Sequence, residues 1–187
     1  METKPLQSVP GWREFQKASA HIKPQSYHFN VSKFSHKVYA QLDAFESDHR
    51  YVVWLDADIV FLKKITQRFL KNLLNEKMCA FLGRRECYTE TGFLIFDTHH
   101  EDFPKFKEEY ANYYNKQYIY ECKCWIDCCA FDGAKKFLDC ENLTPQAHGM
   151  IAVFDISPLA PYMQHDKGNL KYGRKDVLQA EKVQAAN

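Results

Sequence analysis

The feature that most constrains this chain is a short apolar segment that ends in two carboxylates, YVVWLDAD at residues 51–58. The run from Tyr51 to Leu55 is too short for a helix and is rich in β-branched and aromatic residues, so it predicts a strand. A continuous apolar strand is typical of a parallel sheet with both faces buried. Asp56 and Asp58 are two residues apart, so we expect their side chains to project to the same side where the strand ends.

Helical and strand-like patterns alternate along the rest of the 187 residues. Helices are expected over 12–20, from Ser32 as N-cap to 45, and over 65–74, 102–116 and 125–137, with further strands at 79–82, 92–96 and 151–154. This alternation predicts an α/β fold with a mostly parallel central sheet flanked by helices. We expect one domain over residues 1–172 and a polar tail over 173–187.

Composition excludes several classes of function. The net charge of +1 gives no bulk attraction to nucleic acid. The longest apolar run is too short to span a bilayer, and the N-terminus lacks the features of a signal peptide. Four of the seven cysteines crowd at positions 122, 124, 128 and 129, in a spacing that fits no familiar zinc site. We expect reduced, buried thiols in a cytoplasmic protein.

The two carboxylates are placed where ligands bind in open α/β folds, at the carboxyl edge of the sheet. Two such groups repel each other unless they are held apart, protonated or bridged by a cation. A divalent metal on Asp56 and Asp58 is therefore expected. The alternative is a strand that simply ends in a solvated acidic turn, because a bare Asp-x-Asp pair occurs by chance in many proteins.

The block YVVWLDADIVFLKKI resembles the DxD strand of GT-A glycosyltransferases, especially the glycogenin-like family 8 group. The resemblance runs from about Lys33 to Lys171. It implies a GT-A-like fold and a manganese or magnesium ion that bridges the diphosphate of a UDP-sugar. It makes Asp58 the firmer metal ligand and lets Asp56 contact both metal and ribose. GT-A domains open with a strand that cradles the base, and none is evident before Asp56, so the N-terminal portion is expected to be incomplete.

A second segment, HDKGNLK at residues 165–171, matches the HxxGxxK pattern of the same family. His165 can offer an imidazole nitrogen to a metal that carboxylates already hold. Gly168 lets backbone amides approach a diphosphate closely. Lys171 places a cation where the leaving UDP gathers negative charge, with Lys167 as a possible second.

Three further residues correspond to weaker matches. Lys37 lies on a helix whose basic residue, in the family, reaches the sugar nucleotide, although an exposed lysine is equally expected there. Glu90, or Thr91 beside it, lies in a segment that would touch the donor or acceptor sugar. Asp127 falls where the family has an acidic residue near the reacting centre, but the usual Gln that follows is Cys128 here.

These residues together predict a hexosyltransferase-like enzyme that moves a sugar from a nucleotide-sugar to a glycan, protein or small-molecule acceptor. The metal would stabilise the departing diphosphate with Lys171 assisting, and family 8 resemblance implies retention. In an inverting enzyme Asp127 would be the general base.

Two alternatives remain open on the sequence. A haloacid-dehalogenase-type phosphatase would use Asp56 as nucleophile and Asp58 as acid/base, with Asp127 and Asp132 as a late acidic pair for magnesium. The other is an inactive, truncated transferase that acts as a binding module.

Overall fold

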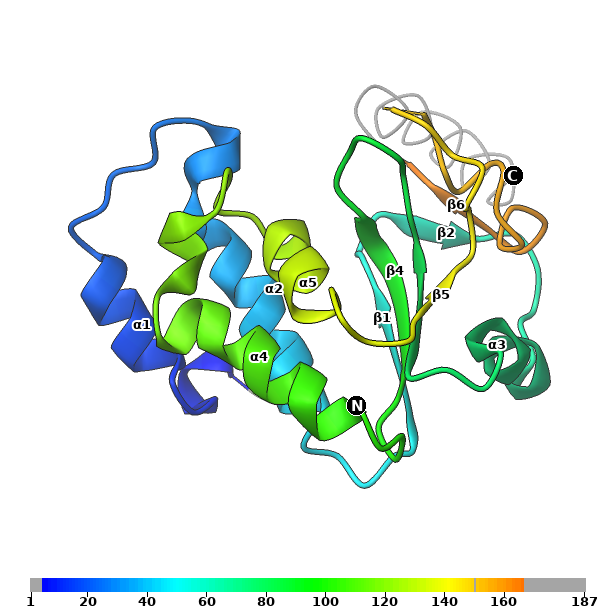
Figure 1. The fold of residues 1–187 in the computed structure, drawn as a ribbon, viewed down its shortest axis with the longest axis horizontal. Coiled ribbons are helices and arrows are strands. Elements are labelled where there is room, and N and C mark those ends of the chain that lie inside the picture. The colour runs from blue at the N-terminus through cyan, green and yellow to red at the C-terminus, as the bar shows by residue number, and fades with distance from the viewer. Residues whose placement is uncertain (1–4, 150, 167–187) are drawn as a thin grey trace, which may run out of the picture.

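The computed structural model describes residues 5–149 and 151–166, and these residues form a mixed α/β structure. Its α-helices are α1 (Trp12–Ser19), α2 (Val31–Ala44), α3 (Gln67–Leu74), α4 (Phe103–Asn115) and α5 (Asp127–Ala134). The strands are β1 (Tyr51–Leu55), β2 (Ile59–Phe61), β3 (Cys79–Leu82), β4 (Glu90–Asp97), β5 (Glu141–Asn142) and β6 (Met163–His165). Short 3-10 turns occupy Leu6–Ser8, Tyr27–Phe29 and Tyr118–Glu121. Helices α1, α2, α4 and α5 lie on one side of the sheet and α3 on the other (Figure 1).

The main sheet has the strand order β1-β4-β3-β5. Strands β1 and β3 each pair antiparallel with β4, and only the pair of β3 with β5 is parallel. The expectation of a mostly parallel sheet is therefore wrong. The chain between β3 and β4 is short and contains no helix, so it returns as an antiparallel neighbour, whereas a parallel pair needs a longer crossover.

Strand β1 is also less enclosed than its apolar sequence predicts. It lies at an edge of the sheet and all five of its residues are half-buried, whereas every residue of β4 is buried. Strand β4 is interior to the sheet, because it pairs with β1 on one side and with β3 on the other. The expectation that β1 is buried on both faces is therefore wrong.

Side-chain caps fix where two of the helices begin. The N-cap of α2 is Asn30, whose side chain accepts a hydrogen bond from Lys33 N at 3.1 Å, and not Ser32 as expected. Thr66 caps α3 in the same way, with its hydroxyl 3.2 Å from Phe69 N. The strand expected at 151–154 is absent from the described residues, which turn there instead.

Two hydrophobic cores lie on the two faces of the sheet. Alternate residues of β4 project to opposite sides: Leu94 and Phe96 pack against α2, α4 and α5, while Phe93 and Ile95 pack toward α3. An aromatic cluster dominates the first core, made of Phe45, Phe96, Phe103, Phe106 and Phe131. These contacts pack α4, α5 and the end of α2 against one face of β4.

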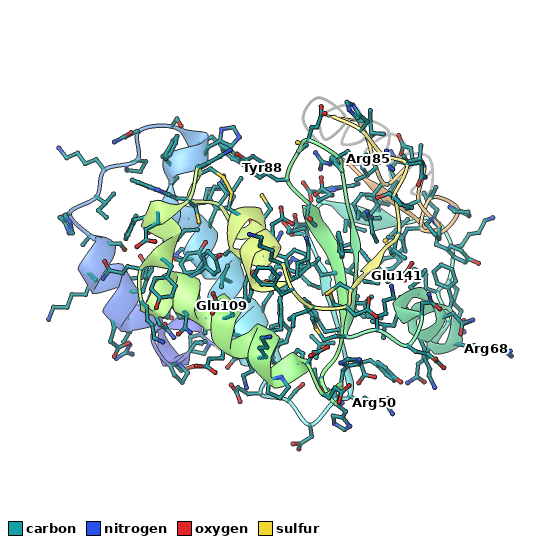
Figure 2. The ribbon with its side chains drawn as sticks, in the orientation of Figure 1. Arg50, Arg68, Arg85, Tyr88, Glu109 and Glu141 are labelled. Carbon is teal, nitrogen blue, oxygen red and sulfur yellow. A yellow bond between two sulfur atoms is a disulfide. The ribbon has the colours of Figure 1, made fainter. Side chains whose placement is uncertain are left out.

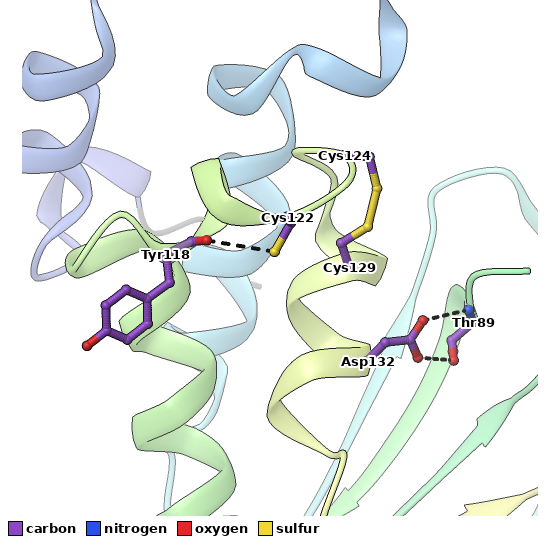
Figure 3. The surroundings of a disulfide bond; sticks show 6 residues. All are labelled: Thr89, Tyr118, Cys122, Cys124, Cys129 and Asp132. Atoms are coloured by element: carbon purple, nitrogen blue, oxygen red, sulfur yellow. Dashed lines mark hydrogen bonds between the residues drawn. A yellow bond between two sulfur atoms is a disulfide. The ribbon is translucent and has the colours of Figure 1, made fainter.

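One pair of cysteines departs from the expectation that all the thiols are reduced. Cys124 and Cys129 form a disulfide beside the first turn of α5 (Figure 3). The other five cysteines are free. The chain turns into the helix at Ile126, where Cys129 N donates to Ile126 O, and this brings two cysteines five residues apart within bonding reach. The prediction of reduced thiols is wrong for this pair.

None of the helices in the described part of the chain is long and apolar enough to cross a membrane.

Candidate functional site

Three strand ends meet at one edge of the main sheet. Because β1 and β3 both run antiparallel to β4, their carboxyl ends lie beside the amino end of β4. Asp56 directly follows β1 and Glu90 begins β4, and Asp56 N donates to Gly92 O at 2.9 Å. Arg85 and Tyr88 mark this end of the sheet and Arg50 marks the opposite end (Figure 2). Carboxylates distant in sequence are therefore neighbours here.

A separate two-stranded sheet brings His165 to the same edge. Strand β2 pairs antiparallel with β6, and its register places Ile59 opposite His165. Asp166 N donates to Asp58 O at 3.1 Å, which extends the pairing to the second aspartate. The imidazole Nε2 of His165 lies 2.8 Å from Asp58 Oδ1.

These side chains line a cavity of about 600 Å³ between the sheet edge, α2 and the start of α5. Its walls also include aromatic residues, among them Tyr27 and Tyr88, which are partly exposed. A hollow of about 960 Å³ at the opposite end of the sheet, around Arg50 and Lys77, contains none of the predicted site residues. The smaller cavity is therefore the candidate site.

Lys37 of α2 is the central cation of the cavity. Its ammonium lies 2.8 Å from Asp56 Oδ1 and 3.0 Å from Asp127 Oδ2, and it donates to Thr91 O at 2.9 Å. Burial alone would lower the pKa of Lys37, but the carboxylates of Asp127 and Asp56 outweigh it and raise the pKa above its ordinary value. Lys37 is therefore charged at neutral pH. The alternative that Lys37 is an ordinary exposed helix lysine is excluded, because its side chain is only 16% exposed.

Asp127 is buried at the first residue of α5, where the helix dipole favours a negative charge. Besides Lys37, its Oδ2 accepts a hydrogen bond from the Thr91 hydroxyl at 2.6 Å. Asp56 is oriented in a similar way, because Trp54 Nε1 donates to its Oδ1 at 2.9 Å. Lys37, Thr91 and Trp54 thus fix both carboxylates from the helix side.

Glu90 occupies the other side of the cavity. Its Oε2 is paired with the guanidinium of Arg84, and its Oε1 accepts a hydrogen bond from Gly92 N at 3.1 Å. The same Oε1 lies 3.8 Å from Nδ1 of His165. Glu90, Asp56 and His165 each offer a ligand atom, and the three atoms lie within 4.8 Å of one another.

The geometry of this trio suits a metal ion. Ligands on opposite sides of a magnesium ion lie about 4 Å apart and those of a calcium ion about 5 Å apart, so the trio needs little movement. Two carboxylates and an imidazole are donors that a manganese-type ion accepts. Gly92 makes room for the imidazole, since a Cβ there would lie 2.7 Å from His165 Cε1.

The structure gathers six of the residues that the sequence singled out. Lys37, Asp56, Asp58, Glu90, Asp127 and His165 all line the one cavity. Lys167, Gly168 and Lys171 lie outside the described residues. Sequence reasoning missed Arg84 and Trp54. Asp56 directly follows β1 and Arg84 lies two residues after β3, so knowledge of the strand order could have found Arg84.

The acidic pair required by the phosphatase alternative is not assembled. Asp132 accepts hydrogen bonds from the amide and hydroxyl of Thr89 and pairs with Lys135 at 2.9 Å (Figure 3). It lines a neighbouring hollow of about 480 Å³, whereas Asp127 belongs to the Lys37 network. The two carboxylates therefore do not converge on Asp56.

No family model matches this sequence, and a search of curated proteins also found no match.

Proposed function

We propose that this chain is a metal-dependent glycosyltransferase, which moves a sugar from a nucleotide-sugar, most simply a UDP-sugar, to an acceptor hydroxyl. The observation that carries the proposal is the meeting of Asp56, Asp58 and Glu90 with His165 in one cavity. The DxD strand and the histidine come from segments more than a hundred residues apart, and a metal-bound diphosphate explains why both are there.

A bound Mn²⁺ would neutralise the diphosphate and act as a Lewis acid for its departure. Asp56, Glu90 and His165 would hold that ion. Their positions are fixed before any ligand arrives, because Trp54 and Lys37 orient Asp56 and Arg84 orients Glu90. Such preorganisation favours stabilisation of charge as it develops on the leaving group.

Lys37 and Asp127 act as a pair on the side of the cavity nearest α2 and α5. The ammonium is held between Asp56 and Asp127, so it can place positive charge beside a bound phosphate or sugar. Asp127 Oδ2 already binds the Lys37 ammonium and the Thr91 hydroxyl, so this oxygen is not free to take a proton from an acceptor hydroxyl. We therefore propose transfer with retention, since inversion would require Asp127 to act as the general base.

The cavity volume is consistent with a ligand of this class, because sites for small molecules and cofactors usually measure about 300–1,000 Å³. Its partly exposed aromatic walls offer apolar contact area for a sugar or base.

The test is turnover of a panel of UDP-sugars, measured as release of UDP with Mn²⁺ and with a chelator. We expect Mn²⁺-dependent release that falls at least about a hundredfold in Asp56→Asn, because the metal supplies most of the stabilisation of the leaving group. Asp139→Asn is the matched control, since Asp139 is an exposed carboxylate that pairs with Lys77 outside the cavity. Equal rates with and without metal would refute the proposal.

A further inference from the structure

The two ring nitrogens of His165 lie in different environments. Nε2 lies 2.8 Å from Asp58 Oδ1, a normal hydrogen bond. Nδ1 has no hydrogen-bond partner in the described residues, although only 4% of the side chain is exposed. The nearest acceptor, Glu90 Oε1, lies 3.8 Å away, which is too far for a hydrogen bond.

The bond to Asp58 decides the chemistry of the other nitrogen. When Nε2–H of a neutral ring donates a hydrogen bond to the Asp58 carboxylate, Nδ1 carries a lone pair and no proton. That lone pair then faces a carboxylate oxygen in a buried site, an arrangement that is costly without a cation between them. A metal ion bound by both atoms removes the cost.

Asp56 supplies a third candidate ligand atom. Lys37 and Trp54 both bind its Oδ1, so the carboxylate is oriented and can offer its other oxygen. Glu90 is arranged in the same way, with Oε2 on Arg84 and Oε1 toward the imidazole. The ligand atoms of Asp56, Glu90 and His165 lie within 4.8 Å of one another.

We infer that Asp56, Glu90 and Nδ1 of His165 form the metal site, and that Asp58 is the hydrogen-bond partner that orients the imidazole. The inference rests on the proposed function for the presence of a metal, but it changes the ligand set. The resemblance to DxD transferases made Asp58 the firmer ligand and gave Glu90 to the sugar. A histidine ligand commonly donates its second N–H to a carboxylate, which fixes the ring and makes it a better ligand.

Titration of Mn²⁺ without nucleotide, followed by the electron paramagnetic resonance signal of the free ion, distinguishes the two ligand sets. Glu90→Gln should weaken Mn²⁺ binding on the order of a hundredfold or more, because a ligand is lost. Asp58→Asn should weaken it by only about tenfold, because the amide oxygen still accepts from Nε2–H. Glu86→Gln, an exposed glutamate, is the control. A larger loss of Mn²⁺ affinity in Asp58→Asn than in Glu90→Gln would restore Asp58 as the ligand and overturn the inference.

A second measurement needs no substitution at the carboxylates and is unaffected if Glu90→Gln fails to fold. Wild-type protein is labelled with histidine carrying ¹⁵N at δ1 only, and pulsed electron paramagnetic resonance records the nitrogen coupled to bound Mn²⁺. We expect ¹⁵N coupling that His165→Ala abolishes. Directly coordinated ¹⁴N in place of ¹⁵N, no nitrogen coupling, or no Mn²⁺ binding by folded protein would each overturn the inference. Mn²⁺ binding as inferred, but with no effect of UDP, would instead refute only the proposed transferase.

Discussion

The imidazole of His165 meets the carboxylate of Asp58 across 107 residues of sequence, with Nε2 2.8 Å from Oδ1. The contact depends on the pairing of β2 with β6, which places His165 opposite Ile59. These two strands form a sheet separate from the main one, and each has three residues. The site is thus joined by a small two-stranded unit that packs on the α3-side core through Ile59 and Met163, whereas Val60 is 37% exposed.

Val60→Pro should therefore lower the affinity for Mn²⁺ while changing the thermal unfolding temperature little. The bonds from Asp166 N to Asp58 O and from Leu62 N to Tyr162 O flank Val60, so the alternation of an antiparallel ladder makes Val60 and Gln164 a hydrogen-bonded pair. Proline removes that donor. We expect Mn²⁺ affinity to fall at least about tenfold, as when a partner that orients a metal ligand is lost.

The control is Val60→Thr, which keeps the backbone donor at a position that is already 37% exposed. Thermal unfolding by circular dichroism gives the stability of each variant. Unchanged Mn²⁺ affinity in the proline variant would show that His165 does not reach the site through β6.

Lys37→Met should lower the free energy of unfolding in the absence of metal. Mn²⁺ should then raise that free energy more in the variant than in wild type. Removal of the ammonium leaves Asp56 and Asp127 without their shared cation, and breaking a buried ion pair costs about 3–5 kcal/mol. A metal on Asp56 restores part of the lost compensation.

The measurement is the free energy of urea unfolding with and without Mn²⁺. The double variant Lys37→Met/Asp127→Asn should recover part of the loss, because one of the unpaired charges is gone. Equal stabilisation by Mn²⁺ in wild type and Lys37→Met would contradict a shared role of the ammonium and the metal at Asp56.

How far the sequence predicts this structure depends on whether a feature is local. The run from Tyr51 to Leu55 and the strand at Cys79–Leu82 have exactly the expected bounds, because short apolar and β-branched runs encode strands by themselves. The antiparallel arrangement of the strands was not predicted, because β4 lies between β1 and β3 and no local pattern specifies its neighbours. Continuous apolarity fits the buried central strand β4 better than the edge strand β1.

The candidate site shows the same division. Asp56, Asp58 and His165 could be proposed from motifs, and all of them line the cavity. The position of Glu90 beside the imidazole follows from the antiparallel register of β4, which only the fold reveals. Arg84 and the Cys124–Cys129 disulfide were missed for a related reason, because each depends on how the chain turns back.

The disulfide predicts a specific result in peptide mapping. Digestion of the non-reduced, alkylated protein should give a linked species that contains Cys124 and Cys129, with Cys79, Cys87 and Cys140 recovered as alkylated thiols. Reduction should lower the free energy of unfolding by about 2 kcal/mol, the order expected for so short a loop. Recovery of Cys124 and Cys129 as alkylated thiols before reduction would contradict the pairing.

A pH dependence of stability is expected from Asp97, at the opposite end of β4 from the site. Burial alone would raise the pKa of Asp97, but hydrogen bonds from Arg50 and from His99 N hold it below its ordinary value of 3.8. A lowered pKa in the folded state stabilises the fold above pH 3.8, and this stabilisation is lost as pH falls through the folded-state pKa.

Asp97→Asn should therefore be less stable than wild type at pH 7, and the difference should shrink below pH 3.8. Urea unfolding of wild type and Asp97→Asn, at pH 7 and again below pH 3.8, measures the difference in the free energy of unfolding. A difference that is the same at neutral and acidic pH would mean that the Asp97 carboxylate contributes through packing and not through its charge.

The most direct test of a metal-dependent nucleotide-sugar site is calorimetric titration of UDP into the purified chain, with and without Mn²⁺. We predict binding that requires Mn²⁺ and is lost in Asp56→Asn but retained in Asp139→Asn. Absence of UDP binding by a folded chain that binds Mn²⁺ would contradict the transferase. Turnover of a phosphomonoester with Mg²⁺ under the same conditions would favour the phosphatase instead.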